Sequence, residues 1–192
     1  RKAIGVIGLA LPVVLLIWSS LIADGVMPGS ISGFYYTSMR DYFVGTLCAL
    51  AVFLFSYKYA PRDNFLSSAA SLFAIGVAFF PTAAAGEPST WTGTVHVVCA
   101  ALFFLVLAVF ACFIFTRRPL KGPVARRKLL RNKIYTACGI TIFACLGLAL
   151  VLALLPRDTL PGRLHALFWL ESIMVWAFSW SWLIKGGFLL ED

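Results

Sequence analysis

The feature that most constrains this chain is a succession of long apolar stretches separated by short polar segments. About 20 apolar residues are needed to cross the roughly 30 Å hydrocarbon core of a bilayer. Six segments meet or approach that length, and they are residues 4–23, 42–57, 65–84, 94–115, 134–155 and 164–184. We therefore predict an all-α polytopic membrane protein, a bundle of six transmembrane helices that forms one domain over residues 1–192.

The composition excludes an ordinary soluble domain. Hydrophobic residues make up 61% of the chain and charged residues 12%, whereas soluble domains average roughly 45–50% apolar and about 25% charged residues. The first apolar stretch is longer than the roughly 7–15 apolar residues of a secretory signal. We expect it to be a retained span. All five cysteines lie inside apolar stretches, so we expect reduced, packed cysteines rather than a disulfide framework.

The basic residues predict the orientation. If the N-terminus is cytoplasmic, the cytoplasmic segments hold 13 of the 16 Lys and Arg residues, and only Arg40, Arg157 and Arg163 lie outside. This asymmetry matches the positive-inside rule. We therefore expect both termini in the cytoplasm, in a plasma membrane of bacterial inner-membrane type.

Eight of these cations lie between Arg117 and Lys133. Each cation beside the inner leaflet gains about 1 kcal/mol from anionic lipid, so we expect this segment to rest on anionic headgroups of the bilayer. A plain topology determinant and a specific anionic partner both remain open. No aromatic interleaving or recognisable module accompanies the charges, and we expect no nucleic-acid binding.

The connection of residues 24–41 is long and rich in Gly and Ser. Such a segment can cap the outer mouth of the bundle. Tyr36 and Arg40 are candidate substrate-binding residues there, although tyrosines also occur in the ordinary aromatic belt of membrane proteins.

Ionisable residues inside spans are costly and therefore indicate function. In the predicted topology Asp41, His96 and His165 begin the second, fourth and sixth spans at one outer depth. Glu171 lies about 9 Å deeper than His165 at 1.5 Å per residue. Asp41 suits helix capping, but Glu171 is too far into an apolar run for a cap to explain it.

The first hypothesis is a metal-assisted lipid hydrolase. His96, His165 and Asp41 would bind zinc and leave an open position for water, because three protein ligands plus water is the usual catalytic arrangement. Glu171 and Asp41 are then the candidate catalytic residues. Cys99 lies three residues after His96 and is a weaker candidate ligand.

Three other hypotheses remain. In a proton-coupled or solute transporter, His165, Glu171 and Asp41 line an outward-facing cavity. In a haem protein, the two histidines are axial ligands. In a structural or partner-stabilising subunit, Asp41 pairs with Arg40 or caps its helix, the histidines lie at the water interface, and Glu171 is satisfied by a neighbouring hydroxyl.

Two resemblances accompany these hypotheses. Residues 29–41 and 165–186, with His165, Glu171 and Lys185, resemble uncharacterised bacterial six-helix membrane proteins, which implies the fold without an activity. Residues 164–169 are more faintly similar to the superfamily of alkaline ceramidases and progestin-type receptors, putative transmembrane hydrolases with a final-helix His-x-x-x-His. His165 matches the first histidine, and Trp169 stands at the place of the second.

Overall fold

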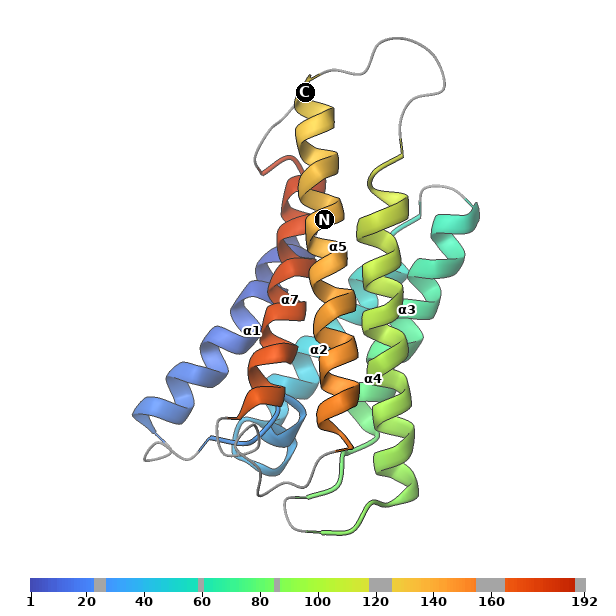
Figure 1. Cartoon of the computed structure of the whole chain (residues 1–192). Helices are drawn as coiled ribbons and strands as arrows, with labels where there is room; N and C mark the ends of the chain where they lie inside the picture. The colour runs from blue at the N-terminus through green and yellow to red at the C-terminus, as the bar shows by residue number, and fades with distance from the viewer. Residues whose placement is uncertain (23–26, 59–60, 85–86, 118–125, 155–164, 189–192) are drawn as a thin grey trace.

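The computed structural model describes residues 1–22, 27–58, 61–84, 87–117, 126–154 and 165–188. Within these ranges the chain is all-helical, with six α-helices and no strand (Figure 1). The α-helices are α1 (Lys2–Leu21), α2 (Arg40–Phe55), α3 (Pro61–Phe79), α4 (Trp91–Val109), α5 (Arg126–Leu152) and α7 (Ala166–Lys185). A 3-10 helix, η1 (Ser32–Tyr36), precedes α2, and a π-helical turn, η2 (Phe110–Ile114), continues α4.

The six α-helices form a closed ring. Each helix packs against its neighbour in sequence, and α7 packs against both α5 and α1, which closes the ring. Successive helices run in opposite directions, as α4, α5 and α7 show clearly in Figure 1. The long α5 meets both α4 and α7, and η1 lies against the start of α2.

Four of the described helices are long and apolar enough to cross a membrane, which indicates an integral membrane protein. They are α1, α4 continued through η2 (Trp91–Ile114), α5 and α7. The 16-residue α2 and the apolar part of α3, Asp63–Phe79, are shorter. The six predicted helices are therefore all present, while length alone identifies four of them as spans.

The boundaries differ from the predicted ones at two places for identifiable reasons. The third helix ends at Phe79 rather than near residue 84, because Pro81 disfavours helical geometry in the residue before it. The fifth begins at Arg126, eight residues before the predicted start. Arg, Lys and Leu are good helix formers, so part of the basic segment extends the helix.

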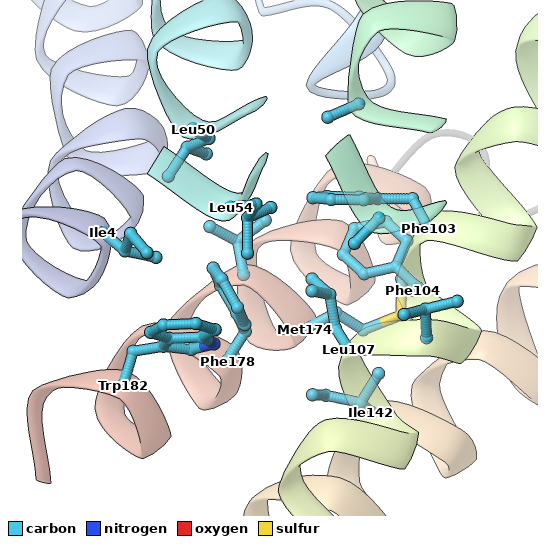
Figure 2. Packing of buried hydrophobic residues seen from close by; sticks show 14 of the residues in the cluster. Ile4, Leu50, Leu54, Phe103, Phe104, Leu107, Ile142, Met174, Phe178 and Trp182 are labelled. Carbon is cyan, nitrogen blue, oxygen red and sulfur yellow. The ribbon is translucent and has the colours of Figure 1, made fainter. Parts of the chain in front are cut away.

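The core is built from apolar side chains of all six α-helices, most of them large, whereas α3 contributes the small Ala70, Ala74, Val77 and Ala78. Figure 2 shows such side chains from several helices converging, among them Leu54 of α2, Leu107 of α4 and Phe178 of α7. Toward the end of α7, Trp182 is fully buried and meets Tyr57 edge to face at 4.8 Å between ring centroids. Such edge-to-face aromatic pairs add about 0.5–1.5 kcal/mol beyond the area they bury.

Candidate functional site

The segment Met27–Tyr36, here called the cap segment, folds against the beginning of α7. Its anchor is Phe34, which is fully buried and packs between the rings of Trp18 and Phe168. The backbone N–H of Phe168 donates a hydrogen bond of 3.0 Å to the carbonyl of Gly29. The cap segment is therefore part of the bundle rather than a loose outer loop.

Glu171 binds this segment directly. Its Oε2 atom accepts a hydrogen bond of 2.6 Å from the backbone N–H of Ile31, the N-cap residue of η1. The backbone of Ser32 also hydrogen-bonds the carboxylate. The first N–H groups of a helix have no partner within the helix, and a carboxylate is a favourable partner for them. Glu171 thus caps η1 across 140 residues of sequence.

This arrangement corrects two sequence-based interpretations of Glu171. Capping does account for its position, but the capped helix is η1 and not α7. Its hydrogen bond comes from a backbone N–H rather than from a neighbouring hydroxyl. Glu171 lies five residues after the first residue of α7, which is about 7.5 Å along the helix axis.

The far end of the cap segment is tied to the connection between α3 and α4. The hydroxyl of Tyr36 donates a hydrogen bond of 2.5 Å to the carbonyl of Thr82. Next to it, the Arg40 guanidinium donates to the Tyr35 hydroxyl at 2.6 Å and lies 4.3 Å from the centroid of the Tyr35 ring. Both predicted substrate-binding residues, Tyr36 and Arg40, thus hold the cap segment in place.

Beneath the cap segment lies a cavity of about 40 Å³ inside the ring. Side chains of α1, α2, α3, α4 and α7 line it, together with Ile31 and Ser32 of the cap segment. Glu171 is the only charged group, and Ser32 the only other polar side chain, among the described residues of its wall. Because a water needs roughly 10–15 Å³, the cavity has room for water beside the carboxylate.

His96 is buried, with 4% of its surface exposed, and its side chain contacts the backbone at the end of α3. Its Nδ1 lies 2.7 Å from the carbonyl oxygen of Phe80, the residue that follows α3. The last carbonyls of a helix lack partners within the helix, and the imidazole supplies one here. His96 lines neither the cavity nor the groove described below.

His165 is the N-cap residue of α7 and has a left-handed backbone with φ of 51°. Its Nδ1 atom is buried and has no hydrogen-bond partner among the described residues. Such backbone geometry is uncommon outside glycine and is several-fold enriched in Asn, Asp and His. The side chain lines neither the cavity beside Glu171 nor the groove between α1 and α2.

Asp41 lies elsewhere. It is exposed in the first turn of α2 and lines a groove between α1 and α2, away from the cavity that Glu171 lines. The N-cap residue of α2 is Met39, and no side chain caps this helix. The interpretation of Asp41 as a side-chain cap is therefore wrong. Its proposed partner Arg40 bonds Tyr35.

The structure does not bring the predicted metal ligands together. Asp41, His96 and His165 all belong to the described part of the chain, and within that part no three His, Cys, Asp or Glu side chains are grouped so that they could hold one metal ion. Glu171 and the cap segment instead form a site from residues about 140 positions apart.

Sequence reasoning missed the polar contacts at the opposite end of the ring. Asp63, in the first turn of α3, forms an ion pair of 2.7 Å with Arg117. Lys128 and Asn132 of α5 donate to the carbonyls of Phe115 and Thr116, at 2.8 and 2.7 Å. The ion pair could have been suspected from the sequence, because Asp63 is an acidic residue in a predicted cytoplasmic region rich in basic ones. The hydrogen bonds of Lys128 and Asn132 could not have been predicted, because they depend on where the chain after η2 lies relative to α5.

No protein-family model, curated protein or solved structure matches the chain. The two resemblances described from the sequence therefore stay predictions. The class of protein defined by the fold is an all-helical integral membrane protein, and its function has to be argued from the site.

Proposed function

We propose that the chain is a six-span membrane carrier, with both termini in the cytoplasm, in which Glu171 binds the proton that drives transport of a small solute. The observation that carries the proposal is that the carboxylate of Glu171 makes two kinds of contact at once. Glu171 lines the cavity inside the ring and at the same time holds the cap segment by the N–H of Ile31.

The ring supports the six-span topology. The shorter helices α2 and α3 fill the place between α1 and α4, which are both long enough to span. At 1.5 Å per residue α2 is about 24 Å long, and bilayers accommodate a mismatch of a few ångströms at modest cost. The position of 13 of 16 cations in the predicted cytoplasmic segments supports the orientation.

The surroundings of Glu171 favour proton exchange. An ionised carboxylate is costly in apolar surroundings unless it is hydrogen-bonded, and apart from Ser32 the other described residues in the wall of this cavity are apolar. The charged form is stabilised mainly by the backbone of the cap segment. A carboxylate whose charge depends on two backbone hydrogen bonds from one segment is suited to gain and lose a proton when those bonds break and form.

Protonation and opening are then linked. Hydrogen bonds to a charged acceptor are roughly twice as strong as those between neutral groups. When Glu171 takes up a proton, its hold on Ile31 weakens, and the part of the cap segment at Ile31 and Ser32 can move away from the cavity while Phe34 and Tyr36 stay anchored. When this part returns, it favours the charged form, and the proton is released. This part of the cap segment thus acts as the outer gate.

The metal-assisted hydrolase is less well supported than the carrier. It needs Asp41, His96 and His165 around one ion, whereas His96 bonds the carbonyl of Phe80 and Asp41 faces a different hollow from Glu171. The haem hypothesis needs both histidines on one iron. Neither histidine lines the cavity.

The test is proton flux in proteoliposomes that contain a pH-sensitive dye, driven by an imposed membrane potential. Wild-type protein should acidify the lumen faster than empty vesicles. Glu171→Gln should reduce this flux at least about tenfold, because the amide cannot carry the proton. Asp41→Asn is the matched control, since it removes a carboxylate at the exposed start of α2 and should leave the flux unchanged.

Two outcomes would overturn the proposal. One is a flux from Glu171→Gln equal to that of wild type at equal protein incorporation and equal melting temperature. The other is a wild-type flux equal to that of empty vesicles over a range of imposed potentials and pH gradients. If the flux falls equally in Glu171→Gln and Asp41→Asn, the loss does not depend on the position of Glu171 in the cavity, and the proposal is contradicted.

A further inference from the structure

The first two turns of α5 extend beyond what a membrane span requires. The helix has 27 residues, which correspond to about 40 Å, whereas the hydrocarbon core is about 30 Å thick. About 10 Å of α5 therefore lies outside the hydrocarbon. Because residues 126–133 are the polar end, this part lies at the level of the lipid headgroups.

These two turns have two chemically distinct faces. Lys128 and Asn132 point to the bundle and donate hydrogen bonds to carbonyls at the end of α4. These bonds fix the rotation of α5 about its axis. The remaining surface is exposed and carries Arg126, Arg127, Leu129, Leu130 and Lys133.

Four of these exposed residues, Arg126, Leu129, Leu130 and Lys133, follow the spacing i, i+3, i+4 and i+7, which places them in one stripe along a helix. Leu129 and Leu130 are 39% and 47% exposed, although each belongs to an apolar residue type. Arg126 and Lys133 at the two ends of the stripe are about 10 Å apart along the axis. Long basic side chains reach several ångströms toward a preferred level, so both can approach one phosphate between them.

Charge favours an anionic occupant. Residues 88–157 contain no Asp or Glu, while eight Lys and Arg residues lie between positions 117 and 133. Arg117 is paired with Asp63 of α3, whereas this stretch of the sequence itself supplies cations and no acidic residue. Exposed leucines between the cations offer apolar contact of the kind that the upper part of an acyl chain takes.

We propose that the stripe Arg126, Leu129, Leu130 and Lys133 is a binding site for an anionic phospholipid. The two cations hold the phosphodiester, and the two leucines contact the glycerol and the upper acyl chain. The site belongs to the end of the ring opposite the cap segment and is independent of the proposed role of Glu171.

The experiment is a titration of the detergent-solubilised full chain with short-chain phosphatidylglycerol, followed by thermophoresis, with short-chain phosphatidylcholine and inorganic phosphate as parallel ligands. Phosphatidylglycerol should bind with higher affinity than both others. Arg126→Gln with Lys133→Gln should weaken its binding about 25-fold, because each cation contributes about fivefold. Leu129→Ser with Leu130→Ser should weaken phosphatidylglycerol binding and leave phosphate binding unchanged.

Two controls separate this site from general effects. Arg126→Lys with Lys133→Arg keeps both charges and should retain most of the affinity. Arg40→Gln removes a cation at the opposite end of the ring and should have no effect. Equal affinity for phosphatidylcholine, equal binding by the Arg126→Gln, Lys133→Gln variant with an unchanged melting temperature, or complete competition by inorganic phosphate would overturn the proposal.

Discussion

The carboxylate of Glu171 and the backbone N–H of Ile31 form a hydrogen bond of 2.6 Å between residues 140 positions apart. Through this bond, α7 holds the cap segment over a cavity that Glu171 itself lines. The same carboxylate therefore contacts both the cavity inside the ring and the segment that covers it. The proposed proton-linked gate rests on this relationship.

The ion pair of Asp63 and Arg117 should couple α3 to the end of α4. The Asp63 side chain is 7% exposed and that of Arg117 is 46% exposed. Arg117→Ala leaves a buried carboxylate without this partner, whereas Asp63→Ala leaves a half-exposed guanidinium that water can solvate. We therefore expect Arg117→Ala to lower the free energy of unfolding at least as much as Asp63→Ala, each by about 1–3 kcal/mol.

A double-mutant cycle in mild detergent measures this coupling. We expect the double variant to lose less than the sum of the single losses, because the two side chains act as a pair. Additive losses within about 0.3–0.5 kcal/mol would show that the two sites are independent.

Gly139 lies where α5 packs closely against α4 and η2. A Cβ atom built at this position would lie 3.1 Å from the carbonyl oxygen of Ala108 and would also collide with Cys112. Gly139→Ala should therefore force the helices apart and lower the free energy of unfolding by about 1–3 kcal/mol. Gly147→Ala on the same helix is the matched control, since nothing lies within 4 Å of its Cβ position.

The control should be neutral or stabilising by up to about 1 kcal/mol, because alanine is the better helix former. The measurement is thermal unfolding of the Gly139→Ala and Gly147→Ala variants in the same detergent, which compares their melting temperatures. Equal melting temperatures for Gly139→Ala and Gly147→Ala would contradict the close packing of α4 on α5.

His165 should be replaceable by residues that accept a left-handed backbone. With φ of 51°, His165→Gly and His165→Asn keep the conformation at little cost, whereas the β-branched His165→Val should destabilise by roughly 1–3 kcal/mol. Melting temperatures of the three variants check this order. If His165→Gly also abolishes proton flux while its melting temperature stays at the wild-type value, the imidazole has a functional part beyond the backbone.

The sequence predicted the all-helical bundle well because long apolar stretches leave few other folds. It predicted the position of α5 less well, since the helix-forming Arg126–Lys133 segment was assigned to a loop on account of its charge. The cap segment was expected at the outer mouth from its length and its glycines. Its 3-10 helix and its anchor Phe34 carry no periodic signal that a sequence shows.

The candidate site was only partly predictable for a related reason. Glu171 stood out because a carboxylate inside an apolar run requires a partner, and the structure supplies that partner from a backbone group. Backbone N–H groups have no sequence signature, so Ile31 could not have been named. His96 and His165 matched a metal set by type and predicted depth, but distances between helices depend on their order around the ring, which hydropathy does not contain.

The most direct test of the proposed gate is amide hydrogen exchange of the cap segment, followed by mass spectrometry as the pH is lowered and corrected for the intrinsic exchange rate. In wild-type protein, protection of residues 30–36 should fall at least about fivefold when Glu171 gains its proton, because a hydrogen bond to a charged acceptor exceeds a neutral one by about 1 kcal/mol. In Glu171→Gln, protection should be low at every pH and independent of it. Protection that stays constant in wild type, or that falls equally in both proteins, would contradict the account.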